Sequence, residues 1–160
     1  MLCYFVLHAD LKPDNVGFTA DGTLKLFDFG LCTLVQSRST STQVYEMTGN
    51  TGSLRYMAPE VAQQKPYCES ADVYSFGIMV WQMARDRTPF HGLSRNDFMV
   101  KVVREQLRPK LDKQWPEEFT RILSSCWHSD PLKRLTFKNI AVELHKLIKA
   151  SGAGGAGGGH

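Results

Sequence analysis

The chain of 160 residues is long enough for one domain with a core of its own. Its apolar fraction of 42% and charged fraction of 22% are typical of a soluble globular domain, and a net charge of +3 is too small to indicate a nucleic-acid partner. Its cysteines are scattered without a metal-ligand spacing, so we expect a reducing compartment and a cytoplasmic protein.

The first seven residues are apolar, but they lack the basic lead-in and the cleavage site of a signal peptide. They are also far shorter than the roughly 20 residues that span a bilayer, so we expect no membrane segment. We interpret residues 1–7 as the last turns of a helix that leads into the polar residues after it.

A polar run, His-Ala-Asp-Leu-Lys-Pro-Asp-Asn, follows directly, and Asp-Phe-Gly comes shortly after it. Phosphoryl transfer needs a carboxylate to orient the attacking hydroxyl and oxygen ligands for Mg²⁺ on the phosphates. Asp10 suits the first task as a catalytic base. Asn15 and Asp28 suit the second as metal and nucleotide ligands, and Lys12 would neutralise charge on the transferred phosphate. The spacing therefore indicates a phosphoryl-transfer site that holds Mg²⁺.

Two short apolar segments, residues 16–18 and 24–27, flank an Ala-Asp-Gly-Thr sequence. Asp-Gly between two such segments is typical of a β-hairpin. This hairpin would hold Asn15 and Asp28 at its two ends, close enough to share a metal ion.

The stretch from residue 31 to residue 57 lacks a hydrophobic period, and a loop of this length is usually functional or disordered. Its hydroxyl side chains are conceivable phosphate acceptors. A merely flexible serine-rich loop is an equal alternative for any one of them. The conceivable phosphate acceptors are Ser37, Ser39, Thr40, Ser41, Thr42, Thr48 and Thr51.

Four helices are predicted after this loop from their apolar spacing. They cover residues 69–85, 94–105, 116–126 and 136–149. The first is apolar on nearly all sides and should be buried. The last should present a core face made of Phe137, Ile140, Leu144, Leu147 and Ile148. Residues 150–160 are rich in glycine and alanine and should form a flexible tail.

These motifs resemble those of the protein kinase family over residues 4–149. The family pattern His-Arg-Asp-Leu-x-x-x-Asn of the catalytic loop matches at His8, Asp10, Leu11 and Asn15, Asp-Phe-Gly matches at residues 28–30, and the Ala-Pro-Glu that closes the activation segment matches at residues 58–60. The resemblance implies a mainly α-helical fold, a kinase C-terminal lobe with a small β-hairpin beside the catalytic loop. It makes residues 1–149 a partial kinase domain and implies that Arg134 pairs with Glu60.

The position of Lys12 after Asp10 resembles the serine/threonine kinases. Residues 55–60, Trp81 and residues 126–127 resemble the tyrosine-kinase-like group of that class. The resemblance implies ATP-dependent phosphoryl transfer to hydroxyls of a protein substrate.

Two positions, Ala9 and Gly17, depart from the family pattern, and a third, Cys32, follows the Asp-Phe-Gly motif. Ala9 stands where the family has an arginine that pairs with a phosphate on the activation segment, which implies a different mode of control with the catalytic groups intact. Gly17 stands where a larger apolar residue commonly supports the adenine ring. Cys32 would lie near the nucleotide, as a space-filling residue more than as a redox sensor.

The sequence supplies no Gly-rich loop and no Val-Ala-Ile-Lys lysine, so we expect the N-terminal β-lobe to be absent. The helix over residues 69–85 would then lose part of its cover, and a missing N-lobe or a partner protein would shield the exposed core. We expect little or no kinase activity from the chain alone. The alternative is a non-catalytic module that binds a partner through its exposed helices.

Overall fold

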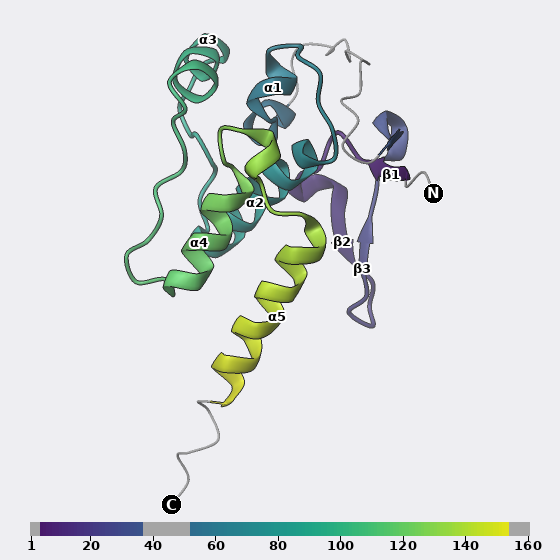
Figure 1. The fold of residues 1–160 in the computed structure, drawn as a ribbon, viewed down its shortest axis with the longest axis vertical. Coiled ribbons are helices and arrows are strands. Elements are labelled where there is room, and N and C mark those ends of the chain that lie inside the picture. The colour runs from purple at the N-terminus through teal and green to yellow at the C-terminus, as the bar shows by residue number, and fades with distance from the viewer. Residues whose placement is uncertain (1–3, 37–51, 154–160) are drawn as a thin grey trace, which may run out of the picture.

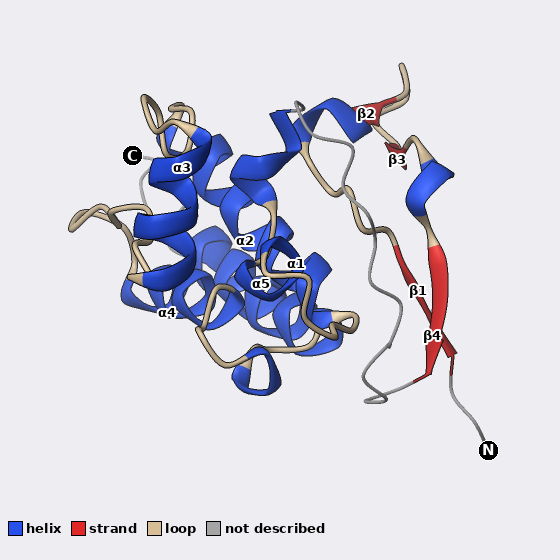
Figure 2. Ribbon diagram, turned by 90° about the horizontal axis from the view of Figure 1, so that it is seen from above, coloured by secondary structure: helices blue, strands red, loops and turns tan. Residues whose placement is uncertain are grey.

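The computed structural model describes residues 4–36 and 52–153, which form a helical body with an arm of strands beside it (Figure 1, Figure 2). The α-helices are α1 (Pro59–Ala62), α2 (Ser70–Arg85), α3 (Arg95–Asp97), α4 (Glu117–Cys126) and α5 (Phe137–Ala153), and the π-helix η4 (Phe98–Arg104) continues α3. The strands are β1 (Tyr4–Leu7), β2 (Val16–Phe18), β3 (Leu24–Leu26) and β4 (Thr33–Gln36), and the 3₁₀ turns are η1 (Pro13–Asn15), η2 (Phe29–Leu31), η3 (Gly52–Tyr56) and η5 (Pro131–Lys133). None of the helices in these ranges is long and apolar enough to cross a membrane.

The apolar N-terminal segment is a strand and not the end of a helix. β1 pairs with β4 in antiparallel register, and Leu7 lies opposite Thr33. The helix predicted over residues 1–7 is therefore wrong for the part that the structure describes. The aromatic and β-branched side chains of this segment favour a strand, but its backbone partner lies far along the chain and local sequence does not reveal it.

The predicted hairpin is confirmed. β2 and β3 pair antiparallel, and Phe18 lies opposite Leu24. In the turn between them Gly22 has a φ of +83°, which glycine adopts without steric cost, and its amide donates to the Thr19 carbonyl at 2.9 Å. The hairpin extends the arm away from the helical body.

α2 runs through the helical body and is buried as predicted. Tyr74, Ile78 and Trp81 on this helix are 0%, 0% and 7% exposed. α4 crosses α2 closely: a Cβ built on Gly77 would lie only 2.5 Å from the Cβ of Cys126. Glycine is thus needed here for a close approach of two helices.

The helices predicted over residues 94–105 and 116–126 are also present, as α3 with η4 and as α4. The first begins with a capping box at Ser94. Its hydroxyl accepts a hydrogen bond from the Asp97 amide, and the Asp97 carboxylate accepts one from the Ser94 amide.

α5 continues through Ala153, so it extends into the residues predicted as a flexible tail; the rest of that tail, residues 154–160, lies outside the described residues. The predicted core face of this helix is only partly correct. Ile140 is 2% exposed, whereas Phe137 and Ile148 are 42% and 69% exposed. Figure 1 shows the reason for Ile148: the C-terminal half of α5 projects beyond the helices that could cover it.

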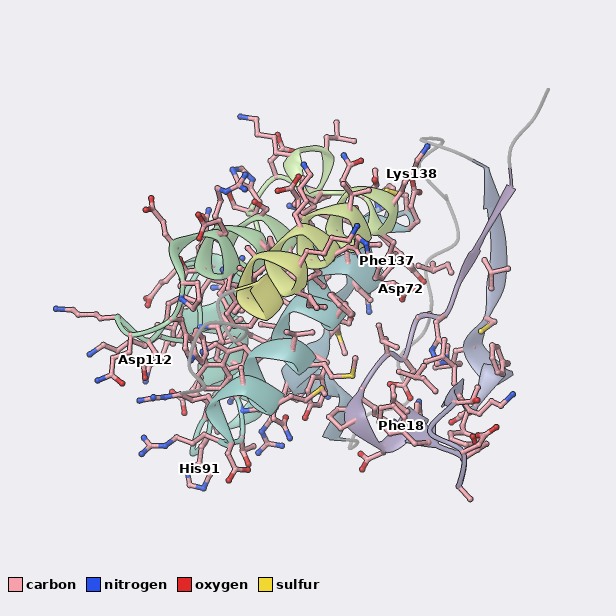
Figure 3. The ribbon with its side chains drawn as sticks, turned by 90° about the horizontal axis from the view of Figure 1, so that it is seen from below. Phe18, Asp72, His91, Asp112, Phe137 and Lys138 are labelled. Atoms are coloured by element: carbon pink, nitrogen blue, oxygen red, sulfur yellow. The ribbon has the colours of Figure 1, made fainter. Side chains whose placement is uncertain are left out.

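Large exposed apolar side chains gather on the strand arm, whereas α2 carries a single one, Met83 at 65%. Five of those on the arm, between 49% and 67% exposed, are Phe18, Leu24, Phe27, Phe29 and Leu31. Figure 3 shows Phe18 on the arm, apart from the helical body. The expectation that α2 would lose its cover is therefore wrong, because α4 and η3 pack against that helix.

Candidate active site

Asp10 is the centre of a short hydrogen-bonded group. The Lys12 Nζ lies 2.6 Å from Asp10 Oδ2, and the side-chain amide of Asn15 donates to the same oxygen at 3.2 Å and to the Asp10 carbonyl at 2.8 Å. No hydrogen bond within residues 4–36 and 52–153 engages Asp10 Oδ1. That oxygen therefore remains able to accept the proton of an incoming hydroxyl.

The loop that carries Asp10 is anchored to α2 by Asp72. The amides of His8 and Ala9 donate to the two oxygens of the Asp72 carboxylate at 2.6 and 3.0 Å. Burial raises the pKa of Asp72, although these two amides stabilise its charged form. The anchor holds Ala9 at a φ of +65°, a left-handed conformation that alanine adopts only under constraint.

Sequence reasoning missed this role of Asp72. The available signal was a carboxylate within a helix whose other residues are apolar, because an acidic side chain is rarely buried without a partner.

His8 joins the catalytic loop to the Asp-Phe-Gly segment. Its Nε2 lies 3.0 Å from the Phe27 carbonyl oxygen, and its ring centroid lies 5.4 Å from that of Phe29. The Phe27 amide in turn donates to the Asn15 carbonyl at 2.9 Å. These contacts bring the two motifs together at the base of the hairpin.

Asp28 itself is exposed and faces its own turn. It has a φ of +57°, and its carboxylate accepts from the Gly30 amide at 3.4 Å. Among the described residues no hydrogen bond joins Asp28 to Asp10, Lys12 or Asn15. The structure thus groups three of the predicted site residues and places the fourth beside them, next to the Phe27–Asn15 backbone contact.

The residues present fit a magnesium ion that is bound together with a nucleotide. Asn15 uses its amide nitrogen as a donor and retains its carbonyl oxygen, and Asp28 offers an open carboxylate. Mg²⁺ takes oxygen ligands, usually one or two from protein and the others from water and phosphate. In the described part of the chain no three His, Cys, Asp or Glu side chains form a metal cluster. A bound Mg²⁺ would neutralise charge on the phosphates.

Cys32 lies against the catalytic loop, with its Sγ 3.7 Å from the His8 carbonyl oxygen. Burial, and then the negative charges of Asp72 and Asp28, raise the pKa of the Cys32 thiol. A raised pKa lowers the fraction of reactive thiolate, which agrees with the space-filling interpretation.

Gly17 has a structural reason to be small. A Cβ built on it would lie 2.9 Å from Cε2 of Phe27, so the Phe27 ring takes the space that a larger side chain would need. The change from the family pattern at residue 17 is thus coupled to the position of Phe27.

The predicted pairing of Glu60 with Arg134 is confirmed. The two guanidinium nitrogens of Arg134 lie 2.6 and 2.8 Å from the two carboxylate oxygens of Glu60, and both side chains are buried. The same guanidinium donates to the carbonyls of Ser70 and His128. This bidentate pair ties α1 to the start of α2 and to the segment before α5.

The predicted phosphate acceptors, from Ser37 to Thr51, lie outside the described residues. The structure describes only the two flanks of that segment, β4 before it and η3 after it.

Comparison with known proteins identifies the fold. The protein kinase domain family matches residues 2–145. A probable serine/threonine-protein kinase of Dictyostelium discoideum is 36% identical over 142 residues, which cover 89% of this chain and 15% of the relative. Serine/threonine-protein kinase STY17 of Arabidopsis thaliana is 35% identical over 147 residues, which cover 92% of this chain and 25% of the relative.

Serine/threonine/tyrosine-protein kinase HT1 of Arabidopsis thaliana is 36% identical over 141 residues, which cover 88% of this chain and 35% of that protein. The chain thus spans well under half the length of these relatives. The matches to STY17 and HT1 confirm the predicted resemblance to serine/threonine kinases of the tyrosine-kinase-like group. With the catalytic loop, the Asp-Phe-Gly segment and the Glu60–Arg134 pair in place, the chain belongs to the protein kinase family and comprises its C-terminal lobe.

Proposed function

We propose that this chain is the catalytic-loop lobe of a protein serine/threonine kinase, which transfers a phosphoryl group from ATP to hydroxyls of a protein substrate. The observation that carries the proposal is the group formed by Asp10, Lys12 and Asn15. Asp10 Oδ1 would accept the substrate proton, while Lys12, held on Oδ2, would place a positive charge beside the transferred phosphate.

The choice of serine and threonine over tyrosine rests on Lys12 and on the names of the relatives. One relative is named for tyrosine as well, so phosphoamino-acid analysis of a labelled substrate mixture is the decisive measurement. We expect label on serine and threonine. Label on tyrosine alone would contradict this assignment.

We further propose that the 160 residues alone have little or no kinase activity. The described residues hold no Gly-rich phosphate loop, and the apolar side chains on the strand arm stay open to water. An N-terminal lobe or a partner protein would cover them. Coding sequence upstream of Met1 should then encode a strand, a Gly-rich loop, a second strand and a lysine-bearing strand.

The test is an assay of the purified 160-residue chain with Mg-ATP and a mixed protein substrate. We expect transfer no faster than in a blank without protein. Mg-ATP-dependent transfer that the Asp10→Asn variant abolishes would contradict the inactivity of the isolated chain, but it would support the catalytic assignment.

The same exposed surface favours a second candidate, a non-catalytic module that binds a protein partner through it. This alternative predicts no upstream Gly-rich loop and a stable fold without nucleotide. The retained Asp10, Lys12, Asn15 and Asp28 argue for the enzyme, because a binding module has no physical need for that set.

We propose the cytoplasm as the location. The described cysteines, Cys32, Cys68 and Cys126, are free thiols, as a reducing compartment requires.

A further inference from the structure

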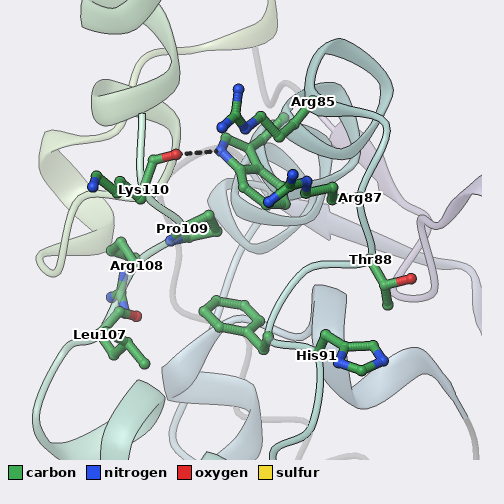
Figure 4. Close-up of a pocket in the computed structure, with 10 residues that line it drawn as sticks. Arg85, Arg87, Thr88, His91, Leu107, Arg108, Pro109 and Lys110 are labelled. Atoms are coloured by element: carbon green, nitrogen blue, oxygen red, sulfur yellow. Dashed lines mark hydrogen bonds between the residues drawn. The ribbon is translucent and has the colours of Figure 1, made fainter. Parts of the chain in front are cut away.

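A cavity of about 610 Å³ lies at the end of α2 that is remote from the catalytic loop. Its walls are the C-terminal turn of α2, the turn after it and the extended segment over residues 107–110 (Figure 4). A rise of 1.5 Å per residue puts Arg85 about 20 Å along the helix from Asp72, which holds the catalytic loop. Figure 3 shows His91 and Asp112 far from the strand arm, on the other side of the helical body from Asp72.

The floor of the cavity is apolar and firmly held. Trp81 is 7% exposed, and its Nε1 donates to the Lys110 carbonyl at 3.0 Å. Phe90 packs edge-on against Phe98, with 5.5 Å between the ring centroids. Leu107, by contrast, is 44% exposed at the rim. The cavity therefore presents apolar surface in a preformed hollow, of a size typical for ligand sites.

Three arginines and Lys110 line this cavity and make it cationic. Arg85 pairs with Asp112, and Arg108 donates to the carbonyls of Leu107 and Trp127. Arg87 is exposed, and within residues 4–36 and 52–153 it forms no ion pair. Figure 4 shows Arg87 next to Arg85 among the residues that line the cavity. Its guanidinium can therefore bind a carboxylate through two parallel hydrogen bonds.

We propose that this cavity is a docking site for a short segment of a partner or substrate protein, with an aromatic or leucine side chain close to an acidic residue. The apolar side chain would cover Trp81 and Leu107, and the carboxylate would pair with Arg87. Charge complementarity selects this occupant, because the one uncommitted arginine at the rim is cationic and the floor is apolar.

Other classes of partner fit less well. A lipid surface binds protruding apolar side chains flanked by several cations, and this floor is recessed. A nucleic-acid backbone needs a row of cations, and here Arg85 and Arg108 are already committed, which leaves only Arg87 and Lys110 among the lining cations. The docking site would hold a partner on the same lobe as the catalytic loop, about 20 Å from Asp72 along α2, and so raise the partner's effective concentration at the lobe.

The experiment is a selection from a random peptide display library on the 160-residue chain alone, after which the enriched peptides are measured on its Arg87→Glu variant. We expect enriched peptides to place an aromatic or leucine residue within two positions of Asp or Glu. Fluorescence anisotropy of the best peptide should give about tenfold weaker binding for Arg87→Glu and for Leu107→Ser. The matched control Lys149→Glu, on exposed α5, should bind as the unchanged chain does.

Circular dichroism and the thermal midpoint of each variant should match the unchanged chain, because Arg87 and Leu107 are exposed. The proposal is overturned by a selection that enriches no motif, by enriched peptides that bind Arg87→Glu equally well, or by a basic motif. Binding of phosphatidylserine vesicles that depends on Arg87, without peptide enrichment, would assign the cavity to lipid instead.

Discussion

Tyr74 is enclosed between two guanidinium groups in the centre of the helical body. The Cζ atoms of Arg108 and Arg134 each lie 5.2 Å from its ring centroid. Its hydroxyl has no hydrogen-bond partner among the described residues, and burial raises its pKa to about 12. The ring thus stabilises two cations, while the hydroxyl is a buried polar group without compensation.

We predict that Tyr74→Phe lowers the free energy of unfolding by less than about 1 kcal/mol or else raises it. The reason is that the change removes an uncompensated hydroxyl and keeps the ring. Tyr74→Leu, which loses both cation–π contacts, should lower the free energy of unfolding by about 2 kcal/mol. Urea denaturation measures both values. A loss in the Phe variant as large as in the Leu variant would contradict this interpretation.

The same residue predicts a pH dependence. Above pH 10 an unfolded tyrosine ionises, while Tyr74 in the folded chain keeps its proton up to about pH 12. The folded state then binds more protons than the unfolded state, so stability falls as pH rises through this interval. The fall should be shallower in Tyr74→Phe than in the unchanged chain when urea midpoints are compared across these pH values.

α2 and α4 cross so closely at Gly77 that α2 can carry no side chain at this position. A methyl group on Gly77 would meet Cys126 Cβ at 2.5 Å, and this carbon belongs to the start of a side chain and cannot move away alone. Separation of the helices is the only relief, and it would loosen the core around Ile78 and Leu123.

We predict that Gly77→Ala lowers the free energy of unfolding by about 1–3 kcal/mol, because overpacking outweighs the gain in helix propensity. Gly152 in α5 is the matched control, since a Cβ there meets nothing within 4 Å. Gly152→Ala should leave stability unchanged or raise it by up to about 1 kcal/mol. Equal effects of the two changes in urea denaturation would show that the crossing is not tight.

Elements whose causes are local could be predicted from the sequence. The hairpin follows from its Asp-Gly turn, the helix that begins at Ser94 from its apolar spacing, and the group around Asp10 from residues within one loop. Elements that depend on distant partners could not. β1 needs β4, and the buried carboxylate of Asp72 acquires its role only when the catalytic loop folds back onto α2.

At the scale of the whole molecule the described chain has a well-packed helical body and an arm with an apolar surface. Phe18 and Leu24 lie opposite each other on the hairpin and are 67% and 53% exposed. Contiguous apolar surface of this kind favours association.

We predict that the 160-residue chain self-associates as its concentration rises and that the double change Phe18→Ser with Leu24→Ser abolishes this. Sedimentation equilibrium gives the mass at each concentration. The control is Leu132→Ser with Ile148→Ser, which removes two apolar residues that are 78% and 69% exposed elsewhere. An equal effect of the control would show that the hairpin surface is not special.

The most direct test of the account is phosphoryl transfer by the longest natural form of the protein that contains these residues. Asp10→Asn keeps the size of the side chain and removes the base, and Asp14→Asn changes an exposed carboxylate in the same loop. We predict transfer from Mg-ATP to serine or threonine in the unchanged protein and in Asp14→Asn, and a loss of about 100-fold or more in Asp10→Asn. Equal transfer by Asp10→Asn and Asp14→Asn would contradict the assignment of Asp10 as the catalytic base.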